Sequence, residues 1–308
     1  MNKKIDVSVI IPAYNAAQTI GILASKILQE TSVDIELIIV NDGSTDDTSH
    51  IVKSIPDHRV VLLEQENQGV YAARNAALSI HRGEWVIFLD ADDDVADGFV
   101  YRRWQTAVKE QADVVIFNAW HSSSKTVHKK QPYGLTLSGH DWIQHCVTHR
   151  EWPHYLWLQI IRSSYIQQHS LSFHQGKSHK DILWTVHLAV NNGRFCLSDH
   201  KDYTYIVNAD SITHRSDYFD VRAQSYIEVI TEIIRLAELE QNRIIRPFLF
   251  RHALVESRHF LGLYRNNVQD IPGVKARFRA NISLMCLFKG ISNVSDMFFF
   301  IKLAGKLL

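Results

Sequence analysis

The chain has 308 residues, 46% of them hydrophobic, which is enough to form a core in one large domain or in one domain with a smaller addition. Its 33 Lys and Arg residues balance its 33 Asp and Glu residues, so no overall charge points to nucleic acid or to an acidic partner. The cysteines, Cys146, Cys196 and Cys286, lie far apart without a CxxC spacing, which argues against a disulfide framework and favours a reducing compartment.

Apolar strand patterns alternate with helical patterns up to about residue 117. Strands are expected at residues 5–11, 35–40, 60–64, 85–90 and 113–117, and helices at 15–30 and 70–80. Strands separated by helices of this length form βαβ units, in which the strands are parallel. The sequence therefore predicts an α/β fold with a mostly parallel central sheet and helices on both faces.

The rest of the chain has a different pattern. Residues 121–135 are polar and basic, and we expect an exposed loop or linker there. Ser138 followed three residues later by Asp141 is typical of a capped helix, which would run to about residue 148. A helix at 181–190 and a strand at 203–207 follow. Beyond residue 217 only long helical patterns remain, which predicts a C-terminal helical appendage.

Basic and apolar residues are mixed in the last segment. Six Lys or Arg residues and a single Asp fall within residues 271–308, beside the apolar run 297–301. One interpretation is a basic amphipathic helix that lies on an anionic membrane surface, and the other is packing against the body or against a second subunit. No stretch approaches the roughly 20 apolar residues that span a bilayer. We expect a cytoplasmic protein, either free or peripheral on the membrane.

Four carboxylates follow the apolar run 86–89, namely Asp90, Asp92, Asp93 and Asp94. Their mutual repulsion is relieved by water or by a shared cation, and oxygen ligands suit Mg²⁺ or Mn²⁺. Open α/β sheets bind their ligands at the carboxyl ends of the strands, where this cluster is expected. The alternative is an acidic turn that caps the next helix. We expect Asp93 and Asp94 to support the structure that follows them.

Three more polar segments are expected at the same edge of the sheet. Residues 12–15 follow the first strand, residues 41–47 follow the second, and Gly69 opens the helix 70–80, whose amino end favours anions. Asp42 offers a carboxylate that accepts two hydrogen bonds. Arg74 lies one turn into the helix and could pair with phosphate, with the acidic cluster or with solvent.

Together these segments resemble the family 2 glycosyltransferases, which have the GT-A fold. The resemblance is carried by Val7-Ser-Val-Ile-Ile-Pro-Ala-Tyr-Asn, Asn41-Asp-Gly-Ser-Thr-Asp, Asn67-Gln-Gly-Val-Tyr-Ala-Ala-Arg-Asn and Phe88-Leu-Asp-Ala-Asp-Asp, in the family's order and spacing. It implies that the nucleotide sugar is bound by Pro12, Ala13, Tyr14, Asn15, Asp42, Asn67, Gly69, Arg74, Asp90, Ala91 and Asp92. It also implies that Asp92 is the ligand of a divalent metal, Mn²⁺ or Mg²⁺.

The resemblance further implies a catalytic base in the second part of the chain. The matching stretch is Phe173-His-Gln-Gly-Lys-Ser-His-Lys-Asp181, in which Gln175 replaces a common Glu and Lys180 replaces the first member of a Glu-Asp pair. Asp181 is retained and is the expected general base. On this resemblance, residues 1–215 form the glycosyltransferase domain, with a nucleotide-binding half (1–120) and an acceptor-binding half (121–215), and residues 216–308 form the helical region.

The expected activity is the inverting, metal-dependent transfer of a sugar from a nucleotide donor to a glycan hydroxyl. The resemblance points to a UDP-sugar donor and to a glycan or lipid-linked glycan acceptor in bacterial lipopolysaccharide or capsule synthesis. One alternative is a non-catalytic sugar-nucleotide-binding protein. The other is a sugar nucleotidyltransferase, which would need a Gly-rich phosphate loop near the amino end, unlike residues 12–14.

Three further features have two interpretations each. His214 and Arg215 follow the strand at 203–207 and could fold back over the diphosphate. Trp152 and Trp157 either stack on an acceptor sugar or pack in the core. The histidines at 145 and 149 flank a cysteine, but without an HExxH motif or paired cysteines we expect scattered surface histidines rather than a zinc site.

Overall fold

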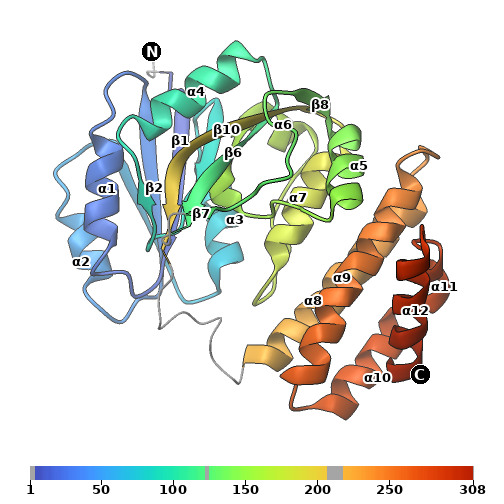
Figure 1. Ribbon diagram of the computed structural model, residues 1–308. Helices are drawn as coiled ribbons and strands as arrows, with labels where there is room; N and C mark the ends of the chain where they lie inside the picture. Colours follow the sequence, from blue (N-terminus) through green and yellow to red (C-terminus); the bar gives the residue numbers. More distant parts are fainter. Residues whose placement is uncertain (1–3, 122–124, 207–217, 308) are drawn as a thin grey trace.

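The computed structural model describes residues 4–121, 125–206 and 218–307 (Figure 1). Its centre is one sheet with the strand order β3-β2-β1-β4-β9-β6-β10-β5, to which β7 and β8 add at β6 and β10. The strands are β1 Val7–Ala13, β2 Ile35–Asp42, β3 Val60–Gln65, β4 Trp85–Phe88, β5 Asp94–Val95, β6 Val114–His121, β7 Lys125–Thr126, β8 Thr136–Ser138, β9 Gln159–Arg162 and β10 Arg194–Tyr205.

The first four strands are parallel, as the alternating pattern predicts. β1 lies between β2 and β4, with Val9 opposite Leu37 on one side and Ile87 on the other. β6 and β10 are also parallel, but β9 lies between β4 and β6 and runs antiparallel to both. The predicted α/β class is confirmed. The short β9 was not predicted, because it directly follows an aromatic segment without strand alternation.

Helices cover both faces of this sheet (Figure 1). The helices of the sheet region are α1 Ile20–Leu28, α2 Thr48–Lys53, α3 Val70–Ile80, α4 Phe99–Lys109, α5 Gly139–His149, α6 Ser163–Gln168 and α7 Lys180–Val190. The expected cap of α5 is present, since the Ser138 hydroxyl accepts a hydrogen bond from the backbone N–H of Asp141. The helix expected at 70–80 matches α3 at both ends.

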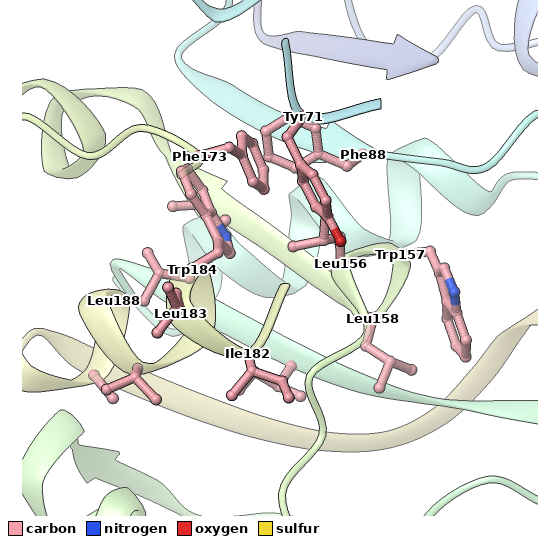
Figure 2. Close-up of a cluster of buried hydrophobic side chains, with 14 of the residues drawn as sticks. Tyr71, Phe88, Leu156, Trp157, Leu158, Phe173, Ile182, Leu183, Trp184 and Leu188 are labelled. Atoms are coloured by element: carbon pink, nitrogen blue, oxygen red, sulfur yellow. The ribbon is translucent and has the colours of Figure 1, made fainter. Parts of the chain in front are cut away.

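An aromatic cluster connects α3, β4 and α7 beneath the carboxyl edge of the sheet (Figure 2). Phe173 stacks on Trp184 with ring centroids 4.1 Å apart, and Phe88 meets both rings edge-on. Tyr71 also packs on Phe173, with ring centroids 6.1 Å apart. Rings in these arrangements gain about 0.5–1.5 kcal/mol per pair beyond their burial. The cluster therefore holds the start of α7, which carries Asp181, against α3.

A buried ion pair fixes the other side of the sheet. Arg103 on α4 and Asp202 on β10 are both fully buried and lie 2.7 Å apart, and Arg103 also donates to the carbonyl of Trp157. Trp157 belongs to the 3-10 turn Leu156–Leu158. A buried pair with its hydrogen bonds satisfied resists the loss of either partner, so this contact fixes α4, β10 and the turn relative to one another.

A helical region follows the sheet. It contains α8 Tyr218–Leu239, α9 Arg246–Asn266, α10 Ile271–Asn281, α11 Leu284–Phe288 and α12 Val294–Leu307. The buried Asp296 of α12 accepts hydrogen bonds from Arg150 after α5 and from Arg258 on α9, at 3.1 and 2.9 Å. The last segment therefore packs against the body of the protein on one side. Within the described residues, no helix is both long and apolar enough to cross a bilayer.

The expectation of an exposed loop or linker at 121–135 is only partly confirmed for the part that the structure describes, where Lys125, Lys129 and Lys130 are exposed but other residues are held against the sheet. Residues 125–126 pair with β6 as β7, and His128 and Gln131 are buried. The side chain of Asn118 donates to the carbonyl of His128 and accepts from its backbone N–H. A polar sequence is held against the sheet here because side-chain amides satisfy its backbone groups.

Candidate active site

Every site residue predicted from the sequence lines one cavity of about 1860 Å³. The predicted residues in its wall are Pro12, Ala13, Tyr14, Asn15, Asp42, Asn67, Gly69, Arg74, Asp90, Ala91, Asp92 and Asp181. They come from the carboxyl ends of β1, β2 and β4 and from the amino ends of α3 and α7. The topology brings together segments that are up to 169 residues apart in the sequence, between Pro12 and Asp181.

The loops after β1 and β2 are joined by hydrogen bonds. The Asn15 side chain accepts from the backbone N–H of Thr45, and the Asn15 backbone N–H donates to the Ser44 hydroxyl. Gly43 has φ +72°, and a Cβ there would lie 2.7 Å from the backbone nitrogen of Asn67. Only glycine allows this close approach, which brings Asn67 beside the end of β2.

Asp42 organises the start of α3. Its carboxylate accepts hydrogen bonds from the Gln65 side chain and from the backbone N–H groups of Gln68 and Gly69, at 2.7, 2.9 and 2.8 Å. The residue is only 3% exposed. A carboxylate has about four acceptor positions, so one remains for a ligand. The predicted contact of Asp42 with a nucleotide base stays a prediction, and its contacts within the protein show a positioning role.

Arg74 links two of the predicted acidic residues. It is 5% exposed, donates to Asp90 Oδ1 at 2.7 Å, and lies 3.6 Å from Asp181 Oδ1. Its guanidinium carbon is 5.7 Å from the ring centroids of both Tyr71 and Phe173. Of the partners considered from the sequence, Arg74 therefore contacts the acidic cluster. It places a positive charge between the end of β4 and the start of α7.

Asp90 and Asp92 differ in their surroundings. Burial and the neighbouring carboxylates of Asp181 and Asp92 raise the pKa of Asp90 above its ordinary value, while Arg74 opposes this increase. Asp92 is exposed and lines the cavity. Asp92 is thus the carboxylate of this pair that a ligand in the cavity can reach most directly.

Asp93 and Asp94 have structural contacts, as expected. Asp93 is buried and accepts hydrogen bonds from the Tyr203 hydroxyl and the Ile206 backbone N–H. Burial and the charge of Asp90 raise the pKa of Asp93 to about 8. Asp94 forms an ion pair with Lys26 of α1. These two residues attach the acidic turn to β10 and α1.

Asp181 lies in the first turn of α7. Its side chain is 36% exposed, and its buried Oδ1 has no hydrogen-bond partner among the described residues. Lys180, which stands where the resemblance implies Glu, is buried, does not line the cavity and forms an ion pair with Glu228 of α8. Gly176 leaves the space for it, since a Cβ there would lie 2.3 Å from Lys180 Cε. Lys180 therefore joins the sheet region to the helical region.

The acidic cluster can contribute to metal binding but does not enclose an ion by itself. Two groups of His, Asp or Glu among the described residues bring three ligand atoms within 4.8 Å of one another, and neither contains Asp92. Mg²⁺ and similar ions are commonly held by one or two carboxylates together with substrate phosphates. Asp92 has an exposed carboxylate and lies close to the carboxyl group of Asp90 in the same cavity, so it fits a site of that kind.

The far wall of the cavity was missed by sequence reasoning. It is formed by α8 and α9 together with the segment before the 3-10 turn, and includes His154, Tyr218, Arg222, Tyr226, Glu256 and His259. Polar residues on long helices look like ordinary solvent-facing positions in the sequence. Their place in the cavity depends on how the helical region packs against α5 and α7, which no local pattern reports.

The tryptophans and histidines for which the sequence left two interpretations have different surroundings in the structure. Trp157 is 3% exposed and stacks on Tyr203 at 4.4 Å, so it packs in the core. Trp152 lines the cavity but stacks on His252 at 4.0 Å. His145 and His149 stack on each other and belong to neither potential metal cluster found in the described part of the chain. His214 and Arg215 lie outside the described residues.

Comparisons with known proteins agree with the resemblance. The family model described as Glycosyl transferase family 2 matches residues 8–176. YibD, an uncharacterized glycosyltransferase of Escherichia coli K12, is 30% identical over 245 residues, which cover 76% of this chain and 71% of YibD. The Escherichia coli UDP-Glc:alpha-D-GlcNAc-diphosphoundecaprenol beta-1,3-glucosyltransferase WfaP is 43% identical over 88 residues, covering 28% of this chain and 35% of WfaP.

A solved structure has the same fold. The crystal structure of S. aureus TarS 1-349 in complex with UDP matches with a TM-score of 0.72 at 19% identity, over 98% of this chain and 88% of the TarS chain. At this identity the likeness concerns the fold, which is of the GT-A type. Because the family model covers more than half of the chain and YibD is aligned over most of both lengths, the protein belongs to glycosyltransferase family 2.

Proposed function

We propose that this protein transfers a sugar from a UDP-sugar, with inversion, to a hydroxyl of a bacterial surface glycan such as lipopolysaccharide or capsule. A divalent metal, Mn²⁺ or Mg²⁺, would be bound by Asp92, and Asp181 would be the general base. The observation that carries the proposal is the pair of carboxylates on either side of Arg74, of which Asp90 is hydrogen-bonded to the arginine and Asp181 is not.

This difference supports separate roles for the two carboxylates. Asp90 accepts a hydrogen bond from Arg74 with one carboxylate oxygen, so its acceptor capacity is partly used within the protein. Oδ1 of Asp181 lies 3.6 Å from the guanidinium of Arg74, which is too far for a hydrogen bond. Asp181 also lines the cavity. Asp181 can therefore accept the proton of an acceptor hydroxyl as the hydroxyl oxygen attacks the anomeric carbon. The bond to the donor's phosphate oxygen breaks in the same displacement, which inverts the anomeric configuration.

The leaving group determines what the donor side must supply. A divalent ion held between the diphosphate and Asp92 would neutralise the charge that develops on the leaving diphosphate. The amino end of α3, positioned by Asp42, presents backbone N–H groups and a partial positive charge on the same side of the cavity. Two similar proteins support UDP as the nucleotide and a lipid-linked glycan as the acceptor: TarS has been solved in complex with UDP, and WfaP is a UDP-Glc:alpha-D-GlcNAc-diphosphoundecaprenol glucosyltransferase.

Replacing Asp92 by Ala is expected to abolish the metal-dependent part of donor binding. In a thermal-shift panel of UDP-, GDP-, dTDP- and CMP-sugars with Mn²⁺, the wild type should be stabilised most by a UDP-sugar, by about 2.7 kcal/mol at 100 times the dissociation constant. The Asp92→Ala variant should show the same small shift with and without Mn²⁺. Asp94→Ala is the matched control, because Asp94 pairs with Lys26, and it should keep the Mn²⁺ effect. A full Mn²⁺ effect in Asp92→Ala would contradict this metal assignment.

A peripheral membrane contact is the second part of the proposal. The side chains of Met285, Phe288, Phe298 and Ile301 on α11 and α12 are between 47% and 71% exposed. Lys289 directly follows α11, and Lys302 lies in α12. Apolar side chains beside lysines suit the surface of a membrane with anionic lipids. The alternative is that a second copy of the chain packs against these residues of α11 and α12.

Co-sedimentation with vesicles tests this contact. The double variant Phe298→Ser and Ile301→Ser should bind vesicles of one-third anionic lipid at least about tenfold more weakly than the wild type, because full burial of one such side chain is worth about 1.5–3 kcal/mol. The matched control is Ile22→Ser on α1, where Ile22 is 65% exposed. Equal partitioning of the double variant and the wild type would rule out a membrane contact through this face.

A further inference from the structure

Three histidines surround one buried glutamate in the wall of the cavity. Glu256 of α9 is 2% exposed. Nε2 of His252 lies 3.1 Å from Glu256 Oε1, and Nε2 of His154 lies 3.9 Å from the same oxygen. Nδ1 of His259 is 3.1 Å from the other oxygen, Oε2. His154 precedes the 3-10 turn in the sheet region, so two parts of the protein that are about 100 residues apart converge on one carboxylate oxygen.

Hydrogen bonding does not account for the position of His154. A separation of 3.9 Å exceeds the length of a hydrogen bond, and Nδ1 of the same ring is buried without a partner among the described residues. Two ligands that each lie about 2.0–2.2 Å from a tetrahedral ion are separated by about 3.3–3.6 Å. The distances of 3.1 and 3.9 Å from His252 and His154 to Glu256 Oε1 lie on either side of that value.

The charge of Glu256 also calls for a cation. Within the described part of the chain, Glu256 pairs only with histidines, which carry a charge only when protonated. A buried carboxylate needs a compensating charge, which either a protonated histidine or a bound metal ion can supply. A divalent ion between the two Nε2 atoms and Oε1 would supply that charge while both imidazoles stay neutral, the form in which imidazole binds metals.

A second His-His-Glu group shows the contrast. His174, His187 and Glu232 also bring three ligand atoms within 4.8 Å of one another. There, both carboxylate oxygens of Glu232 accept hydrogen bonds from Arg235 at 2.7 Å, and the two histidines contact each other at 3.2 Å. The carboxylate of this group already has its cation. This group therefore serves as a matched control.

We propose that His154, His252 and Glu256 form a second divalent metal site, suited to Zn²⁺ and separate from Asp92. Two imidazoles and one carboxylate are a ligand set that Zn²⁺ accepts, with one position left for water or a substrate oxygen. His259 supports the site by holding the second oxygen of Glu256. The ion would fasten the segment that carries His154 to α9. It would also place a positive charge in the wall of the cavity that contains Asp181.

Binding of Zn²⁺ alone tests the proposal. The full chain carrying Asp92→Ala is stripped with a chelator and titrated with Zn²⁺ by equilibrium dialysis, without any nucleotide sugar. The expected result is one Zn²⁺ per chain, with binding at least about tenfold weaker after His154→Ala or Glu256→Gln, the lower bound for changes around a metal site. His187→Ala, in the control group, should leave the affinity unchanged.

Three results would overturn the proposal. The first is that the protein binds no stoichiometric Zn²⁺, the second is that His154→Ala leaves the affinity for Zn²⁺ unchanged, and the third is that His187→Ala abolishes Zn²⁺ binding. The His154 side chain is 19% exposed and makes no hydrogen bond among the described residues, so His154→Ala keeps the test valid even where Glu256→Gln fails to fold. The titration uses no donor sugar and no turnover, so its outcome is independent of the glycosyl transfer proposed above.

Discussion

Replacing Asp181 by Asn is expected to lower kcat by about 10²–10⁴-fold, the range for the loss of a general base. The amide has the shape of the carboxylate but cannot take the proton of the acceptor hydroxyl. Donor binding should be kept, because the predicted nucleotide contacts lie at the ends of β1, β2 and β4 and at the start of α3. Turnover and the thermal shift with a UDP-sugar and Mn²⁺ separate the two effects.

A matched control for this variant is Asp141→Asn. Asp141 also lies in the first turn of a helix, α5, but it does not line the cavity. This variant should turn over like the wild type. Wild-type turnover in Asp181→Asn would remove Asp181 as the base, whereas loss of the donor-induced shift would give Asp181 a role in donor binding instead.

Arg74→Met is expected to have the second largest effect. The change removes the cation between Asp90 and Asp181, so two partly buried carboxylates face each other without compensation. We expect a loss of about 1–3 kcal/mol in the free energy of unfolding, which is the cost of a buried polar group left without its partner. Because the Asp90 side chain is 37% exposed, the loss should stay below that of a fully buried ion pair.

The same variant should change the pH dependence of activity. In the wild type, burial raises the pKa of Asp90 and Arg74 opposes this increase. Without the guanidinium the pKa of Asp90 rises further, so Asp90 is protonated at a higher pH as the solution is acidified. The acid limb of kcat/KM is therefore expected to move to higher pH in Arg74→Met and to move less in Arg74→Lys, which keeps the charge. An acid limb that stays in place in both variants would contradict the assigned role of Arg74.

The nucleotide side of the fold could be predicted because its signals are local. Each strand of the β3-β2-β1-β4 group is a short apolar run, and each ends in polar residues that the parallel topology brings to one edge. Helix α3 matches its predicted range because alanine-rich helical spacing starts directly after Gly69. The four strands begin and end within two residues of their expected ranges, and α3 has the expected range.

Strand β10 shows where local patterns fail. The sequence predicts a strand only at 203–207, whereas β10 begins at Arg194. The polar residues 198–202 interrupt the apolar pattern, and the pairing of β10 with β6 shifts register between Leu197 and Lys201. Asp202, in this polar stretch, can be buried in the strand because it forms an ion pair with the buried Arg103. A partner 99 residues away leaves no local signal in the sequence.

The acceptor side of the cavity could not be predicted for a related reason. Lys180 was recognised as a departure from the family pattern, but its partner Glu228 lies on α8 and became visible only in the packed structure. Glu256 and His154 are likewise brought together by the packing of α9 against the sheet region. Contacts between elements that are distant in the sequence depend on how whole helices pack, and this packing decides which polar residues of α8 and α9 face the cavity.

Release of UDP from a panel of UDP-sugars, with Mn²⁺ and a mixture of glycan acceptors, decides whether this protein is a transferase. We expect Mn²⁺-dependent UDP release by the wild type. The Asp181→Asn variant should bind the same donor but release UDP about 10²–10⁴-fold more slowly. If the wild type bound a UDP-sugar and released no UDP from any donor, the protein would be a sugar-nucleotide-binding protein without transferase activity, and the account would be wrong.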